Sequence, residues 1–274
     1  MKPMTYPISP VHWDSQFFGF PIGKIELPEN YDKEELETTF QEAHSKYRLM
    51  FLSVLGEGPD SLSLLGNKCP CYVRKLSFRK DVPKNVEAVD SRIQAYASTF
   101  CSSTLERLAV QSGIMTQFRQ DPELSPHFER LFLTWVNFAV TKELADSIWT
   151  WCEKGQYLGM ATVRCAKRTD PETGQVEREG RIGMFSVDSQ HRRQGIGANL
   201  IRACDFWCSS LDIPVNAIIV QKENEPAISL CKKMDFRQDC ETSVYHYWSP
   251  GWIYDAHRGW TVHAAGQSGV RSSE

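Results

Sequence analysis

The sequence has no long hydrophobic run, no apolar leader and no strong excess of charge of either sign. No segment approaches the ~18–20 consecutive apolar residues of a membrane-spanning helix, and residues 1–13 lack the apolar core of a secretory signal. The formal net charge of -3 gives no general reason to expect nucleic-acid binding. We therefore expect a cytoplasmic protein that binds neither a membrane nor nucleic acid.

The sequence also lacks the cysteine and histidine spacing of a metal site. Its nine cysteines are scattered through the chain without a disulfide framework. Cys69 and Cys71 are closely spaced, but no second pair and no histidine spacing completes a zinc site around them. We expect free thiols and no bound metal.

A chain of 274 residues with 41% hydrophobic and 24% charged residues has the composition of an ordinary globular protein. The polar stretch 81–90, which contains Pro83, is the best candidate for a linker. The sequence therefore predicts an N-terminal α/β subdomain over 1–82 and a larger domain over 91–248. A polar extension follows over 249–274.

Hydrophobic periodicity predicts the elements on both sides of this linker. In the first segment it predicts strand and turn over 11–27, a helix within 29–48, and strands over 49–55 and 71–78. In the second, Ser125-Pro126 opens a helix after a loop over 113–126. An antiparallel meander then covers 148–151, 157–165 and 181–187. A strand over 215–220, a helix over 225–234 and a strand pair over 236–248 complete the prediction.

The stretch from Arg181 to Ala198 organises the chain. It reads as a strand, a short basic turn and a glycine-rich helix start. The N-terminus of a helix carries partial positive charge and unpaired N–H groups, so it suits an anion. Gly195 and Gly197 let the backbone approach that anion closely. The pattern predicts a phosphate or pyrophosphate site.

Two motifs in this region carry a family resemblance. Arg192 to Gly197 matches the motif Q/R-x-x-G-x-G/A, and Asn224 to Ala227 matches a following N-x-x-A segment. Over about residues 105–248 the chain resembles the GNAT superfamily of N-acetyltransferases. The resemblance implies an α+β fold with a mostly antiparallel central sheet flanked by helices. It also implies acetyl-CoA or another acyl-CoA as co-substrate, held by Phe185, Ser186, Val187, Arg192, Arg193, Gln194, Gly195, Ile196, Gly197, Ala198, Asn224 and Ala227.

The catalytic residues are less clear because the sequence departs from the family pattern. The family often places a tyrosine, the acid that protonates the leaving coenzyme A, seven residues after the motif asparagine. Here that position is Cys231, which could protonate the thiolate or merely pack near it. Tyr245 and Tyr247 are substitutes on the last strands. Asp188 and His191 flank the basic turn and are the candidates for general base.

A narrower resemblance extends over nearly the whole chain. Residues 13–19 form a W-x-x-x-F-F-G element, and Phe118-Arg119 and the helix over 128–140 are also similar to the bacterial dTDP-fucosamine acetyltransferase group. That group N-acylates nucleotide-linked amino sugars for surface polysaccharides such as lipopolysaccharide. The resemblance implies contacts with the sugar nucleotide from Trp13, Asp14, Phe118 and Arg119.

The sequence thus predicts an N-acyltransferase that moves an acetyl or hydroxyacyl group from acyl-CoA to a dTDP-linked amino deoxysugar. Two alternatives stay open, a peptide or protein N-acetyltransferase and a non-catalytic acyl-CoA-binding module. The sequence does not choose the sugar, the amine position or the acyl chain. Strand edges after Asp235 make a homodimer reasonable.

Overall fold

The computed structural model describes residues 6–84, 86, 89–169, 173–255 and 259–262. The chain divides into two compact units. The first comprises Met1–Tyr72 and Thr242–Glu274, and the second comprises Val73–Glu241. These bounds differ from the predicted segments because residues 75–81 pair with a strand of the second unit, whereas residues 242–248 pair with a strand of the first.

The first unit is a small α/β structure. In chain order its elements are β1 (Ser9–Pro10), α1 (His12–Phe18), β2 (Ile22–Leu27), α2 (Lys33–Ala43), β3 (Leu49–Leu55), β4 (Ser61–Leu64), the first part of β5 (Asn67–Asp81), the last part of β11 (Arg237–Trp248), β12 (Trp252–Asp255) and β13 (Gly259–Val262). β3 pairs in parallel with β2 and antiparallel with β11. The apolar face of α2 covers these strands through Leu36, Phe40 and Ala43, all buried.

Three local predictions were wrong. Residues 12–18, predicted as strand and turn, form the helix α1, which ends where Gly19 takes a left-handed conformation with φ of 78°. The strand pair predicted over 236–248 is one strand, β11, and the segment contains no glycine, proline or asparagine to make a turn. The loop predicted over 113–126 contains the short helix α4 (Gln117–Gln120).

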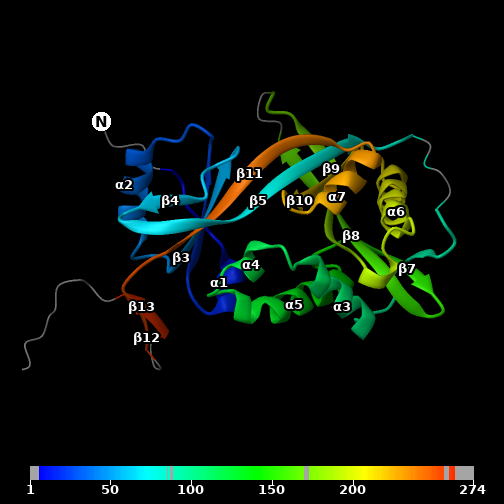
Figure 1. Ribbon diagram of the computed structural model, residues 1–274, viewed down its shortest axis with the longest axis horizontal. Coiled ribbons are helices and arrows are strands. Elements are labelled where there is room, and N and C mark those ends of the chain that lie inside the picture. Colours follow the sequence, from blue (N-terminus) through cyan, green and yellow to red (C-terminus); the bar gives the residue numbers. More distant parts are fainter. Residues whose placement is uncertain (1–5, 85, 87–88, 170–172, 256–258, 263–274) are drawn as a thin grey trace, which may run out of the picture. The chain divides into compact units, whose positions relative to one another are not determined.

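The second unit is a sheet covered by helices on both faces. Its elements are the last part of β5, β6 (Ile93–Ala95), α3 (Ser103–Ser112), α4, the 3-10 turn η1 (Ser125–His127), α5 (Phe128–Val140), β7 (Ser147–Glu153), β8 (Gln156–Thr169), β9 (Val176–Val187), the 3-10 turn η2 (Ser189–His191), α6 (Ile196–Ser210), β10 (Val215–Gln221), α7 (Glu225–Lys233) and the first part of β11. The strands lie in the order β5-β10-β9-β8-β7-β6, and only the β9–β10 pair is parallel. α3 and α5 lie on one side of β7–β9, and α6 lies on the other (Figure 1).

The helices pack through sequence features that are local and simple. Ser102 caps α3 by accepting a hydrogen bond from the Leu105 N–H. Leu131, Phe132 and Val136 of α5 are buried, and each contributes about 1.5–3 kcal/mol through apolar burial. A Cβ at Gly113 would lie 2.1 Å from the Phe132 ring. The end of α3 can therefore approach α5 only because residue 113 has no side chain.

A β-bulge interrupts β9 at Gly183 and Met184, shortly before the turn that leads into α6. Ala161 of β8 faces Phe185 and Val163 faces Ile182, so two residues of β9, Gly183 and Met184, oppose one residue of β8. The Thr162 hydroxyl accepts a hydrogen bond from the Met184 N–H at 2.8 Å, which satisfies the displaced backbone. A Cβ at Gly183 would lie 2.8 Å from that hydroxyl oxygen.

Beyond the bulge, β9 and β10 separate. Their parallel pairing stops at Ile182 and Ile218, so residues 183–187 of β9 have no partner on β10 in the described structure. β10 remains paired with β5 along its whole length. The result is a gap in the sheet, bordered on one side by the free edge of β9.

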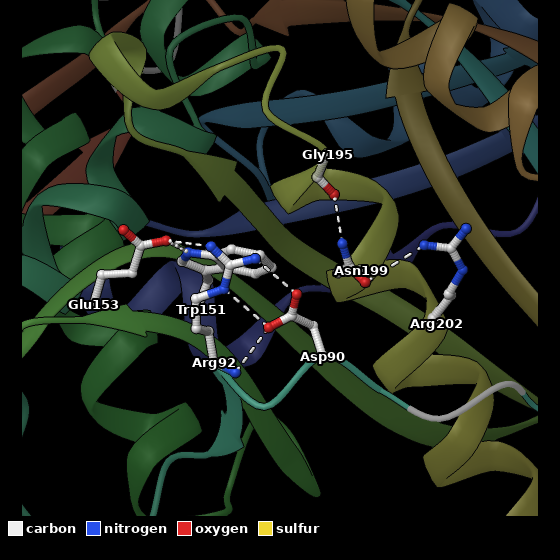
Figure 2. A network of polar contacts seen from close by, with 7 residues as sticks. All are labelled: Asp90, Arg92, Trp151, Glu153, Gly195, Asn199 and Arg202. Carbon is white, nitrogen blue, oxygen red and sulfur yellow. Dashed lines mark hydrogen bonds and ion pairs between the residues drawn. The ribbon is translucent and has the colours of Figure 1, made fainter.

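A network of cation–π and hydrogen-bond contacts ties the segment before β6 to β7. The Arg92 guanidinium lies 4.1 Å from the Trp151 ring and donates to Asp90 and Glu153 (Figure 2). The Trp151 Nε1–H also donates to Glu153, at 2.8 Å. Asp90, predicted to end a linker, is therefore tied to β7.

Neither a membrane span nor a metal cluster is visible in what the structure describes. None of the helices within these residues has the length and apolar character needed to cross a bilayer. In the same ranges, no three His, Cys, Asp or Glu side chains gather in a way that could hold a metal ion.

Candidate functional site

The turn between β9 and α6 is shaped to receive an anion. Arg193 and Gly195 both have left-handed backbones, with φ of 61° and 80°. The N–H groups at the start of α6, over 195–198, have no intrahelical acceptor, and no other described residue accepts from them. The Asn199 N–H and its side-chain Nδ2 each donate to the Gly195 carbonyl at 3.1 Å, and Arg202 holds Asn199 in turn (Figure 2).

Gly197 needs to be glycine for reasons of space. A Cβ at this position would lie 2.9 Å from the Leu230 side chain and 3.6 Å from the Phe185 ring. The first turn of α6, the start of α7 and the strand β9 thus converge on one residue without a side chain. The two glycines and the free N–H groups together have the shape and polarity that a pyrophosphate site needs.

Asp188 holds the turn in place. Its carboxylate accepts hydrogen bonds from the Gln190 N–H at 3.0 Å and from His191 Nδ1 at 2.9 Å, and it forms an ion pair with Arg107 of α3. The hydrogen bond from His191, followed by the contacts with Arg107 and Gln190, lowers the pKa of Asp188 below its ordinary value. These three partners satisfy the buried Asp188 carboxylate and connect the turn to α3.

A cavity of about 880 Å³ runs along the turn and the free edge of β9. This volume lies in the range of small-molecule sites. Eleven of the twelve residues predicted to hold acyl-CoA line it, and Gln194 does not. The eleven are Phe185, Ser186, Val187, Arg192, Arg193, Gly195, Ile196, Gly197, Ala198, Asn224 and Ala227.

A second cavity of about 450 Å³ adjoins the first. The two share lining residues from α3, β9, β10 and α7, namely Ser112, Phe185, Gln221, Asn224, Ala227 and Leu230. Trp135, Leu144 and Ile219 give the smaller cavity apolar walls, and Arg164 and Arg181 supply its cations. No Asp, Glu, His or Tyr is among the described residues that line it.

The predicted base candidates lie outside both linings. Asp188 and His191 contact each other at the turn, and neither is among the residues that border the two cavities. Their role in catalysis stays a prediction.

Cys231 lies on the wall of the smaller cavity but is 1% exposed. Burial raises the pKa of its thiol to about 11. The thiol is therefore protonated at neutral pH, and its surroundings are the apolar cluster beneath α6 and α7.

The two tyrosines considered as substitutes are core residues of the first unit. Tyr245 is 0% exposed, and its hydroxyl donates to the Pro59 carbonyl at 2.7 Å. Tyr247 is 1% exposed and packs edge-on against Phe40 at 4.8 Å. Neither lines either cavity.

Asn224 has a structural role that explains the N-x-x-A spacing. Its side chain caps α7 by accepting from the Ala227 N–H at 3.3 Å, and Pro226 follows within the first helical turn. The motif thus fixes where α7 starts, and this start forms one side of both cavities.

Sequence reasoning missed the contribution of α3. Gln111 donates from Nε2 to the Val187 carbonyl at 2.8 Å and lines the larger cavity, while Ser112 lines both. Gln221 at the end of β10 was missed as well. No local motif marks Gln111 and Ser112, because only the packing of α3 against β8 and β9 brings them to the site.

The residues predicted to bind the sugar nucleotide fall into two groups. Trp13 and Asp14 lie on α1 of the first unit, where burial raises the pKa of Asp14 to about 6. Phe118 and Arg119 lie on α4 of the second unit, outside both linings.

Within the second unit, each α4 residue has a clear local contact. Phe118 packs edge-on against Trp135 at 5.4 Å and so supports the wall of the smaller cavity. Arg119 is exposed and donates to the Ser125 hydroxyl at 2.9 Å.

Comparison with known proteins agrees with this geometry. Residues 110–236 match the model of the acetyltransferase (GNAT) family. No match was found among curated proteins.

Several solved structures are similar to this chain at low sequence identity. A conserved protein of unknown function from Staphylococcus epidermidis aligns with a TM-score of 0.53 at 9% identity, over 84% of this chain and 85% of that one. A tandem GNAT protein from the clavulanic acid biosynthesis pathway aligns with a TM-score of 0.49 at 13% identity, over 84% and 76%. A GCN5-related N-acetyltransferase from Sphaerobacter thermophilus aligns with a TM-score of 0.42 at 12% identity, over 73% and 60%.

Proposed function

Because residues 110–236 form a GNAT acetyltransferase domain, we propose that this protein transfers an acyl group from acyl-CoA to the amine of a nucleotide-linked amino deoxysugar. The group is acetyl or a hydroxyacyl, the nucleotide is dTDP, and the product serves surface polysaccharide synthesis. One observation carries the proposal. The cavity lined by the predicted acyl-CoA residues adjoins a second, cation-bearing cavity.

The donor would lie along the larger cavity. The N–H groups of residues 195–198 would bind its pyrophosphate, and Arg192 and Arg193, both exposed beside the turn, would add charge-assisted hydrogen bonds. The unpaired edge of β9 from Gly183 to Val187 would pair with the amides of the pantetheine arm, as an added strand does. The Val187 carbonyl already accepts from Gln111, which orients this edge.

The chemistry that remains for the protein is positioning and polarisation. Bound acyl-CoA supplies an activated thioester. The backbone N–H groups near Phe185 and Val187 would polarise its carbonyl oxygen in the manner of an oxyanion hole. They belong to a strand whose course is fixed by the bulge at Gly183 and Met184.

Cys231 is a poor proton donor for this reaction. A thiol with a pKa near 11 that protonates a thiolate of ordinary pKa, about 8.5, transfers its proton uphill by roughly 3 kcal/mol. The side chain therefore packs beside the donor, and the proton for the departing thiolate comes from the attacking amine or from water.

The acceptor cavity favours an anionic substrate. Arg164 and Arg181 line it, and no described lining residue is a carboxylate, although Glu179 outside the lining pairs with Arg181. A nucleotide-linked sugar carries a diphosphate, which two guanidinium groups recognise well. A basic peptide would meet like charge at this surface.

Thiol release from acetyl-CoA tests the proposal. The purified protein is incubated with acetyl-CoA and each of a panel of dTDP- and UDP-linked 4-amino and 3-amino deoxysugars, with basic and acidic peptides as the comparison. We expect free thiol only with an amino-sugar nucleotide. Turnover with peptides alone would refute the sugar assignment, and tight binding of acetyl-CoA without turnover on any acceptor would establish a non-catalytic module.

A further inference from the structure

Two arginines face each other across the β8–β9 ladder at the smaller cavity. Arg164 and Arg181 are direct cross-strand partners, both are exposed, and both line that cavity. Side chains directly opposite in an antiparallel pair point to the same face of the sheet. The two side chains therefore leave the sheet on the same face, at one wall of the cavity.

The charges around this pair leave Arg164 in excess. Arg181 donates from Nε to Glu179 at 2.6 Å, and Glu179 also pairs with Arg79 at 3.3 Å. Elsewhere in the same group, Arg168 pairs with Asp239 and Glu177. These three arginines balance three carboxylates, whereas Arg164 has no ion-pair partner within the described ranges.

None of the described residues that line the cavity provides a counter-ion. Its other walls are apolar or neutral, with Trp135, Leu144 and Ile219 among them. Arg164 thus lies uncompensated beside an apolar recess, with a second arginine on the same face. An anionic ligand group would stabilise this arrangement by charge-assisted hydrogen bonds.

The position of the pair on the strands sets a distance. The expected place of the thioester carbonyl is the strand edge at Phe185, whose partner on β8 is Ala161. Ala161 and Arg164 are three residues apart, which corresponds to about 10 Å along a strand. An anion at Arg164 would therefore lie about 10 Å from the reacting amine.

We propose that Arg164 and Arg181 form an anion subsite for the acceptor, which holds a phosphate or diphosphate group about 10 Å from the amine. The inference deepens the proposed function and rests on it. It assigns the recognition of the acceptor's phosphates to Arg164, with Arg181 as a weaker partner because Glu179 shares its charge. A free amino acid does not fit the subsite, since its carboxylate lies next to its amine.

The ladder also offers a matched control. Lys167 and Arg178 form another like-charged cross-strand pair on β8 and β9, and neither lines either cavity. Arg178→Gln therefore removes an exposed charge from the same strand without touching the proposed subsite.

Calorimetric titration of dTDP and of inorganic pyrophosphate into the protein tests the subsite, with acetyl-CoA kept saturating so that the pyrophosphate turn is occupied. We expect Arg164→Gln to weaken dTDP binding by about 10- to 100-fold and Arg181→Gln to weaken it less. Arg178→Gln should change it less than twofold, and the Kd of acetyl-CoA should stay the same in all three variants.

Two results would overturn the subsite. One is dTDP binding that is equal in the wild type and Arg164→Gln, and the other is no binding of dTDP or pyrophosphate to the acetyl-CoA complex. Either result would leave the proposed acyl transfer intact if amino-sugar nucleotides still release thiol. Conversely, binding of dTDP that depends on Arg164 supports the subsite even if no sugar in the panel turns over.

Discussion

The sharpest test of the pyrophosphate turn compares two substitutions at Gly195 that have the same shape and different charge. Gly195 has φ of 80° and open space around it, since the nearest atom to an added Cβ is the Asn199 Nδ2 at 3.8 Å. Gly195→Asn and Gly195→Asp therefore meet no steric clash within the protein. Asparagine and aspartate are also the side chains that tolerate a left-handed backbone best.

The difference between the two variants isolates one negative charge. A carboxylate about 5 Å from a phosphate charge interacts with it by about 3 kcal/mol at an effective dielectric constant of ~20. The turn is exposed to solvent, and screening reduces this to about 1–2 kcal/mol. The Asp variant should thus bind acetyl-CoA about 5- to 30-fold more weakly than the Asn variant.

Isothermal titration of acetyl-CoA at 50 mM and 300 mM salt measures this difference. The gap between the two variants should narrow at the higher salt, because the repulsion is electrostatic. Thermal unfolding checks that both variants fold alike. Equal affinity of the Asp and Asn variants for acetyl-CoA at both salt concentrations would refute the placement of the pyrophosphate at this turn.

Three further predictions concern buried groups. Cys231→Ala should lower turnover less than about threefold and lower the free energy of unfolding by about 1 kcal/mol. A loss of 100-fold or more in initial rate would show instead that the thiol is the acid that protonates the leaving thiolate. Asp14→Asn should raise the free energy of unfolding in urea by about 1–2 kcal/mol above pH 6 and leave it unchanged below pH 4. The sign follows from the folded-state pKa of Asp14, about 6, which lies above the ordinary 3.8. The wild type therefore loses stability as the pH rises from about 4 to 6, and the Asn variant does not. A stabilisation of the Asn variant at pH 3.5 would contradict this reasoning. Lys80→Met should lower the free energy of unfolding by about 3 kcal/mol, because it leaves Asp205 buried without its ion-pair partner at 2.5 Å. The double variant Lys80→Met with Asp205→Leu should recover much of this loss. A loss below 1 kcal/mol for Lys80→Met alone would show that the pair is not effectively buried.

The residues of the proposed donor site could be picked out in the sequence because the feature is local. A strand, a basic turn and a glycine-rich helix start lie within residues 181–198, so their spacing alone places the turn. The N-x-x-A spacing was informative for the same reason, since the Asn224 cap and Ala227 are one helical turn apart. Eleven of the predicted residues consequently line one cavity.

The acceptor half could not be predicted in this way because it is built from elements far apart in sequence. Ser112 of α3, Arg164 of β8 and Gln221 of β10 meet only in the folded sheet. None stands in a motif, and each residue type is common on protein surfaces. The sequence led instead to Arg119 as the phosphate-binding cation, which the structure places on α4 outside both cavity linings.

The boundary between the two units was missed for a related reason. A long strand leaves no composition signal where its pairing partner changes, and both β5 and β11 contain such a point. The polar stretch 81–90 looked like a linker, but its last residue is fixed to Arg92, which stacks on Trp151. Asp90 belongs to an ion-pair network with Arg92 and Glu153 in the second unit.

The bulge at Gly183 and Met184 explains how the site could function without the tyrosine of the family pattern. By displacing β9 from β10 it exposes a strand edge for the donor, and the same gap admits the smaller cavity where the acceptor would lie. The thioester end of the donor would then be placed by main-chain atoms, whose positions do not depend on the identity of residue 231. Positioning of two reactants can supply several kcal/mol of a barrier, and backbone N–H groups aimed at developing charge supply more. Catalysis of this kind would depend on Thr162, whose hydroxyl holds the bulge, more than on the buried thiol of Cys231.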